Sequence, residues 1–212
     1  VLESRYLLMI GLLMLLLNLI NSPGGYILGS SFEAAAAAAT GQTSGVIYTE
    51  YLTRLSASFF RAGLISALFI QFLLVARSIQ CLGVGIGLMI LPAIAVGGYG
   101  LIALFPFLPV IRMVKIAENS TDYSLQNTVR NILFLPTTRE QKYKGKQVVD
   151  SFFVRVGDAM QAVVGFVGTS VLAASLASFA AFNAIIAIVW MILAFMIGKK
   201  YRQRTATNEP SG

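Results

Sequence analysis

A stripe of polar residues at helical spacing is the feature of this sequence best suited to chemistry. The stripe consists of Lys115, Glu118, Asn119, Asp122, Gln126 and Arg130. Steps of four from Glu118 to Arg130 put these side chains on one face of a helix, and the other members lie close to that face. Two carboxylates four residues apart repel each other, so we expect one of them to hold a proton or to pair with Lys115 or Arg155. The spacing therefore predicts a polar pathway with a candidate site for proton or cation coupling.

The stripe follows a strongly apolar region. Residues 81–110 carry no charge, and 57% of the whole chain is hydrophobic whereas only 12% is charged. Soluble domains carry about 25% charged residues, and the mean hydropathy of +0.76 points away from them. Several uncharged stretches approach or exceed the ~20 residues that a helix needs to span a bilayer. These features predict an integral membrane protein.

Two interpretations of the stripe are open at this point. A polar face on a membrane-spanning helix must lie against protein or a water-filled cavity, because lipid does not solvate it. On that interpretation the stripe lines a translocation pathway. On the other, the stripe belongs to a cytoplasmic extension of the helix, where water solvates it and it has no role in transport.

The apolar blocks predict an all-α, polytopic bundle of six membrane helices. We expect these helices at about 6–28, 57–79, 82–104, 106–135, 147–175 and 178–198, with an outer loop at 29–56 and a cytoplasmic tail at 201–212. The apolar block 81–114 would form a helix of about 51 Å, longer than the ~30 Å hydrocarbon core, and Pro106 offers a break. Pro23 is expected to bend or end the first helix. Hydropathy alone also allows five spans, with residues 118–147 in the cytoplasm.

Lysine and arginine residues indicate the orientation. A basic cluster, Lys142, Lys144 and Lys146, lies in a polar connection, and the last apolar block ends in GKKYRQR (198–204). Because cytoplasmic loops carry an excess of Lys and Arg, we expect both ends of the membrane domain in the cytoplasm, with a bacterial inner membrane as the location. The net charge of +7 does not indicate nucleic-acid binding, since the basic residues flank apolar spans instead of forming one face.

The fifth predicted helix contains a second pair of charges. Arg155 and Asp158 are three residues apart, and Gln161 continues the same face. Two interpretations are open: Arg155 binds an anion while Asp158 tunes it, or the two form an ion pair that only stabilises charges inside the bilayer.

Other residue types exclude several functions. The chain has no His and one Cys, Cys81, so His acid–base chemistry, Cys/His zinc sites and internal disulfides are excluded. We expect Cys81 to be a small buried hydrophobe, and the glycines of GVGIG (83–87) to allow close helix packing. No catalytic residues, metal site or cofactor are predicted, so the chain is not expected to be an enzyme.

Residues 115–158 resemble the nucleotide (ATP/ADP) translocases of bacteria and plastids. The resemblance rests on K-G-K-x-x-V-D (144–150), on R-x-G (155–157) and on the spacing of NLIN and YIL in the first helix. The stretch RNILFLP (130–136) resembles a divergent branch found in free-living bacteria. Those translocases are twelve-helix, major-facilitator-like transporters, so the resemblance implies that this chain, which begins with Val, is the C-terminal six-helix half and a fragment.

The resemblance also implies a function. We expect transport of nucleotides or another organic anion by alternating access, with ATP binding among the expected properties. The expected partners are the lipid bilayer, an N-terminal half of the same protein and a small anionic substrate, but no nucleic acid. The alternative is a non-transporting membrane anchor or sensor module of a larger fused protein.

Overall fold

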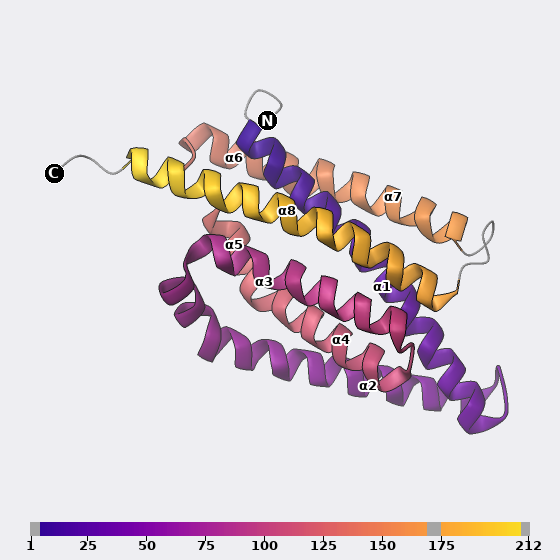
Figure 1. Cartoon of the computed structure of the whole chain (residues 1–212). Coiled ribbons are helices and arrows are strands. Elements are labelled where there is room, and N and C mark those ends of the chain that lie inside the picture. Colours follow the sequence, from indigo (N-terminus) through magenta and orange to yellow (C-terminus); the bar gives the residue numbers. More distant parts are fainter. Residues whose placement is uncertain (1–4, 169–174, 209–212) are drawn as a thin grey trace.

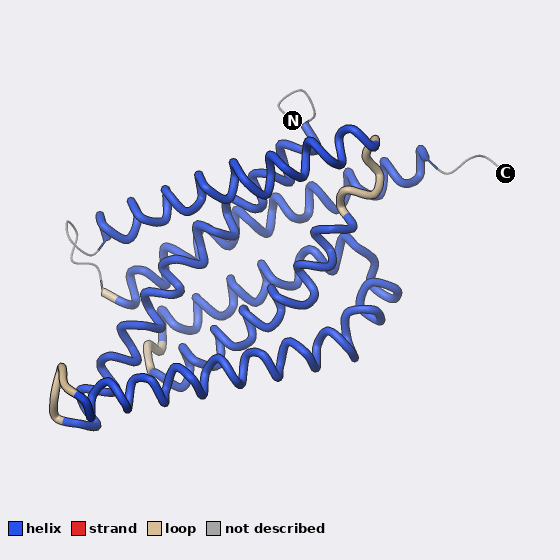
Figure 2. The backbone as a smooth tube through the Cα atoms, turned by 180° about the vertical axis from the view of Figure 1, so that it is seen from behind, coloured by secondary structure: helices blue, strands red, loops and turns tan. Residues whose placement is uncertain are grey.

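The computed structural model describes residues 5–168 and 175–208, and in these ranges the regular structure is helical (Figures 1 and 2). The α-helices are α1 (Arg5–Thr40), α2 (Val46–Phe69), α3 (Ala76–Leu104), α4 (Leu108–Thr121), α5 (Asn127–Ile132), α6 (Arg139–Val148), α7 (Val154–Phe166) and α8 (Leu176–Asn208). Three π-helical segments join some of them: η1 (Ile70–Val75), η2 (Asp122–Gln126) and η3 (Val149–Phe153). The all-α prediction is therefore confirmed for the described residues.

The helices run side by side along one bundle axis. η2 joins α4 to α5 and η3 joins α6 to α7, so that each group forms one long helical rod. One end of the bundle holds the α1–α2 and α3–α4 connections, and we call it the loop end. The opposite end holds α6, the start of α1 and the end of α8, and we call it the terminal end (Figure 1).

Four helical stretches of the described chain are long and apolar enough to cross a membrane: Arg5–Thr40, Val46–Leu73, Ile79–Leu104 and Leu176–Ala206. The α4–α5 and α6–α7 rods do not meet this criterion. The membrane character of the chain agrees with these four stretches, while six spans remain a prediction.

The structure differs from the predicted outer loop at 29–56. Helix α1 continues through Pro23 to Thr40, and α2 begins at Val46, so only residues 41–45 connect them. The alanine run lies inside α1 because Ala has the highest helix propensity. The helix ends where Gly41 adopts a positive φ of 68°, which favours glycine.

The structure also differs from the sequence prediction at the connection between the second and third predicted helices. The chain turns through η1 and a kink inside α3 at Gly83, where φ is 76° and ψ is 165°. Gly83 therefore serves the turn, whereas Gly85 packs closely against α8: a Cβ on Gly198 would lie 2.9 Å from the Gly85 Cα. Cys81 lies beside this kink and is exposed, so the prediction that it is buried is wrong.

The core of the bundle forms mainly between α1, α3 and α8, with Tyr99 and Trp190 fully buried. The α4–α5 rod adds Val114, Leu125 and Val129 to the same core. Residues 108–132 therefore pack inside the bundle and do not extend beyond it as a solvated helix. At the terminal end, α8 continues to Asn208, so the predicted tail is helical as far as the structure describes it.

Candidate functional site

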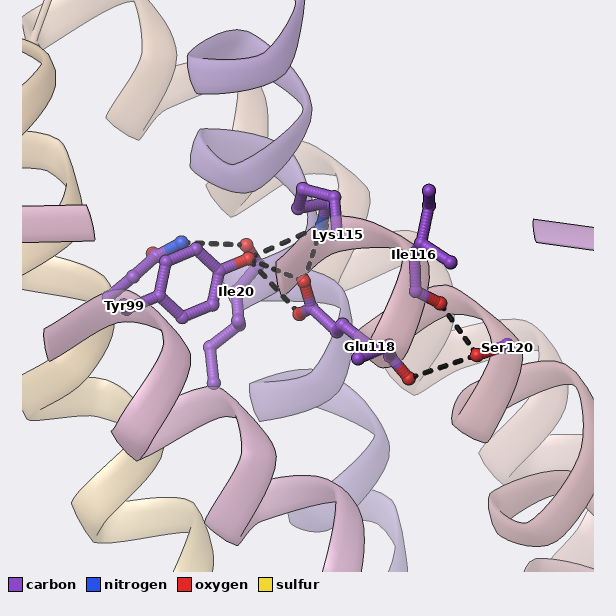
Figure 3. Close-up of polar contacts among 8 residues, drawn as sticks. Ile20, Tyr99, Lys115, Ile116, Glu118 and Ser120 are labelled. Atoms are coloured by element: carbon purple, nitrogen blue, oxygen red, sulfur yellow. Dashed lines mark hydrogen bonds and ion pairs between the residues drawn. The ribbon is translucent and has the colours of Figure 1, made fainter. Parts of the chain in front are cut away.

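A buried ion pair lies at the centre of the bundle. Lys115 and Glu118 are three residues apart on α4, so they share one face, and their side chains are only 4% and 2% exposed. The Lys115 Nζ lies 2.6 Å from the Glu118 Oε2. Tyr99 of α3 donates its hydroxyl to the Glu118 carboxylate at 2.9 Å and accepts from the Lys115 Nζ at 3.3 Å (Figure 3). The Glu118 charge is therefore neutralised within the bundle.

Helices α1 and α8 complete the surroundings of this pair. Asn183 of α8 donates from its Nδ2 to the Ile20 carbonyl of α1 at 3.0 Å. Gly24 of α1 lies so close that a Cβ there would come within 2.7 Å of the Lys115 Nζ and would also clash with the Tyr99 hydroxyl. Four helices thus meet at one polar cluster, which we call the central network: Tyr99, Lys115, Glu118 and Asn183.

Replacing Gly24 with Ala is expected to destabilise the protein by about 1–3 kcal/mol, because the added methyl group overpacks the central network. Unfolding of the purified protein in detergent, followed by temperature, measures the effect. Gly25→Ala is the matched control, since a Cβ at Gly25 meets nothing within 4 Å. Equal stability of the two variants would contradict the close approach of α1 to Lys115.

A polar cavity of about 370 Å³ lies beside the central network. Three residues of the sequence-predicted stripe contribute to it: Asp122, Gln126 and Arg130. The full lining is Met14, Leu17, Asn18, Asn21, Asp122, Tyr123, Gln126, Asn127, Arg130 and Val154. The cavity is therefore built from α1, from the η2–α5 part of the central rod and from the start of α7.

Several polar atoms around this cavity lack a partner among the described residues. Both amide atoms of Gln126, the Nδ2 of Asn18 and the Nε of Arg130 are buried without a hydrogen bond. Arg130 donates to the Asn127 Oδ1 at 3.1 Å and points another N–H at the Met14 sulfur at 3.7 Å. A buried polar group left unpaired costs about 1–3 kcal/mol, so this lining favours water or a polar solute in the cavity.

The π-helical turn η2 explains why the stripe changes direction along the rod. Ser124 donates its hydroxyl to the Ser120 carbonyl at 2.6 Å, and Thr128 donates to the Ser124 carbonyl at 3.0 Å. Such bonds to the carbonyl four residues earlier loosen a helix locally, and π-turns are frequent at functional sites. The wider turn carries Asp122 and Gln126 to the cavity, whereas Glu118 stays in the central network.

Comparison with known proteins identifies the family. The family model of the TLC ATP/ADP transporter matches residues 46–201, which is most of the chain. The chain belongs to the TLC ATP/ADP transporter family. It is also similar to the ADP,ATP carrier protein 1 of Chlamydia pneumoniae, with 27% identity over 120 residues. That match covers 52% of this chain and 23% of the carrier, and no solved structure matches.

The TLC family assignment confirms the resemblance drawn from the sequence, but the structure separates the predicted site residues into groups. Lys115 and Glu118 belong to the central network and are not among the residues that line this cavity, so a role for them in the pathway stays a prediction. Asn119 is half-buried and is not part of the cavity lining.

The charged residues of the fifth predicted helix are not part of the central network or of the cavity lining, although the neighbouring Val154 lines the cavity. Arg155 and Asp158 are exposed, and no ion pair joins these two described residues. The basic cluster of Lys142, Lys144 and Lys146 lies on α6 at the terminal end and is exposed. The Lys146 Nζ donates to the Asn131 Oδ1 at 3.0 Å. The structure therefore shows no ion pair between the described residues Arg155 and Asp158, and anion binding at Arg155 stays a prediction.

Sequence analysis missed Tyr99, Tyr123 and Arg112. Tyr99 lies among glycines in an uncharged block, where its hydroxyl is the local sign of a polar partner. Arg112 lies one turn before Lys115 and donates to the Ser58 hydroxyl of α2 at 3.0 Å. Its position three residues from Lys115 already places it near the stripe.

Proposed function

We propose that this chain forms half of a transporter for a nucleotide or another organic anion. The observation that supports this best is the polar cavity, which Arg130 and Gln126 help to line while the Gln126 amide and the Arg130 Nε have no hydrogen-bond partner among the described residues. A guanidinium binds phosphate groups with two parallel hydrogen bonds, and an amide can pair with a base or sugar. The family and the similar Chlamydia carrier support a nucleotide as the solute.

The proposed topology has six spans with both ends in the cytoplasm. The α4–α5 and α6–α7 rods run beside the four apolar helices (Figure 1), and the polar stripe of the α4–α5 rod explains why hydropathy does not select that rod. Arg139, Lys142, Lys199 and Lys200 gather at the terminal end, which is therefore the cytoplasmic end on the positive-inside rule. The loop end then faces outward.

Alternating access needs a second wall for the cavity. We propose that a second six-helix half of the same protein, of major-facilitator type, closes the cavity and moves against this half. Exposed Arg155 and Asp158 on α7 would then face that second half and the solute. A membrane anchor or sensor is a weaker candidate, because neither needs a polar cavity lined by unpaired amides.

Uptake by the full-length transporter in liposomes tests this function. Liposomes loaded with unlabelled ADP should take up labelled ATP at a rate that saturates with ATP concentration. Other organic anions are compared as competitors. Absence of uptake for every nucleotide and organic anion offered would refute the proposal and favour an anchor or sensor.

Replacing Asp122 with Asn is expected to remove most of the pH dependence of transport. Asp122 is the carboxylate that lines the cavity, whereas Lys115 already neutralises Glu118. A proton that moves with the solute would therefore bind at Asp122. Uptake rates from pH 5 to pH 8 measure the effect. Tyr123→Phe is the control, because it changes the cavity lining without touching a carboxylate. An unchanged pH profile in Asp122→Asn would assign the proton elsewhere.

A further inference from the structure

Arg112 occupies an unusual setting between α2 and α4, near the loop end. Its Nη2 donates to the Ser58 Oγ at 3.0 Å. The Ser58 hydroxyl gives its own proton to the Leu55 carbonyl at 2.7 Å, so it serves Arg112 only as an acceptor. Arg112 is half-buried and is therefore held by a neutral group that leaves its charge uncompensated.

A second arginine, Arg61, lies on the same face of α2 as Ser58. Arg61 follows Ser58 by three residues, which puts the two side chains on one face of the helix. The ion pairs found among the described residues join Arg54 to Glu50 and Lys115 to Glu118, so neither Arg61 nor Arg112 has a carboxylate partner there. Two guanidinium groups carry ten N–H donors between them, and Ser58 accepts one.

We propose that Arg61, Ser58 and Arg112 form a phosphate-binding site between α2 and α4, separate from the cavity at Arg130. Arg112 and Arg130 are 18 residues apart on one rod, about 27 Å at 1.5 Å per residue. One small phosphate group cannot touch both. Unpaired arginines within or beside an apolar span are costly unless an anion or water satisfies them, and a phosphate oxygen matches the guanidinium fork.

The phosphate group has two possible sources, a soluble phosphate ester or the headgroup of an anionic lipid. Naming a nucleotide as the soluble ligand rests on the proposed function, but phosphate binding itself does not. If the soluble ligand is a nucleotide, the site holds its phosphates before they reach the cavity.

Thiol labelling in proteoliposomes tests the site with inorganic pyrophosphate as the probe. Cys81 is the single cysteine, so a Cys81→Ser background carries one new thiol, Ala62→Cys, one turn after Ser58. At about ten times its Kd, we expect pyrophosphate to slow the reaction of this thiol with a membrane-impermeant reagent about tenfold, because only the unoccupied fraction reacts. Added Arg112→Gln or Arg61→Gln should abolish this protection. Added Arg54→Gln should leave it intact, because Glu50 already pairs with Arg54.

Two lipid compositions distinguish the sources of phosphate. Protection by pyrophosphate in phosphatidylcholine vesicles indicates a soluble ligand. Protection that instead follows added phosphatidylglycerol, without pyrophosphate, indicates a lipid headgroup. Either result supports the phosphate site if Arg112→Gln removes it. Labelling that neither probe changes, or protection that survives Arg112→Gln, overturns the site. Protection without nucleotide uptake would refute only the proposed function, and uptake without protection would refute only this inference.

Discussion

Replacing Lys115 with Met should destabilise the protein by about 3–5 kcal/mol, because it leaves the Glu118 carboxylate buried without its cation. Glu118→Met should have a similar effect through the orphaned ammonium group of Lys115. The double variant Lys115→Met/Glu118→Met should recover most of this loss, since two apolar side chains replace a pair that is costly to desolvate. Thermal unfolding in detergent, analysed as a double-mutant cycle, measures the coupling.

The chain offers an exposed ion pair as a matched control. Arg54 and Glu50 also lie at 2.6 Å, but their side chains are 77% and 58% exposed. The same three variants at that pair should change stability by no more than about 1 kcal/mol, because solvent and salt screen surface pairs. If the Lys115 and Glu118 variants behave like this control, the pair is not buried in the folded protein.

The double variant also distinguishes a structural role of the central network from a direct role in transport. If the central network only joins four helices, the double variant should fold and retain uptake once it is stable. If uptake is lost while the protein stays folded, Lys115 or Glu118 acts directly on the solute or on a coupling ion.

Replacing Arg130 with Gln should raise the KM for uptake about 10- to 150-fold, with the protein still folded and inserted. Arg130 lines the cavity and its Nε has no hydrogen-bond partner among the described residues, and hydrogen bonds to charged groups contribute about 1.5–3 kcal/mol, which corresponds to that range. Arg130→Lys should recover part of the loss, because it restores the charge without the planar fork. Uptake kinetics in liposomes measure all three proteins.

Arg139→Gln provides the control for a general charge effect. Arg139 is exposed at the start of α6 and does not line the cavity, so its loss should leave the KM within about twofold of the unmodified protein, a change below 0.5 kcal/mol. Equal effects of the two substitutions would mean that Arg130 acts through surface potential. Normal kinetics in Arg130→Gln would remove Arg130 from the solute path.

The sequence by itself determined that this protein is helical and membrane-embedded, because hydropathy and helical spacing are local properties of the chain. It also placed Asp122, Gln126 and Arg130 on one face. Predicted helix ends were less accurate: the segment after Leu28 is expected to be a loop because of its small polar residues, but α1 continues through its alanine run to Thr40.

Only the tertiary structure decided what each face of the central rod contacts. Glu118 shares the sequence pattern of Asp122, yet Tyr99 and Lys115 enclose it, while the π-helical turn carries Asp122 to the cavity. Tyr99 comes from another helix, and Gly24 permits the close approach of a third. Whether a charged side chain is enclosed by partners or faces a cavity depends on residues far away in the sequence, and spacing along one helix carries no information about them.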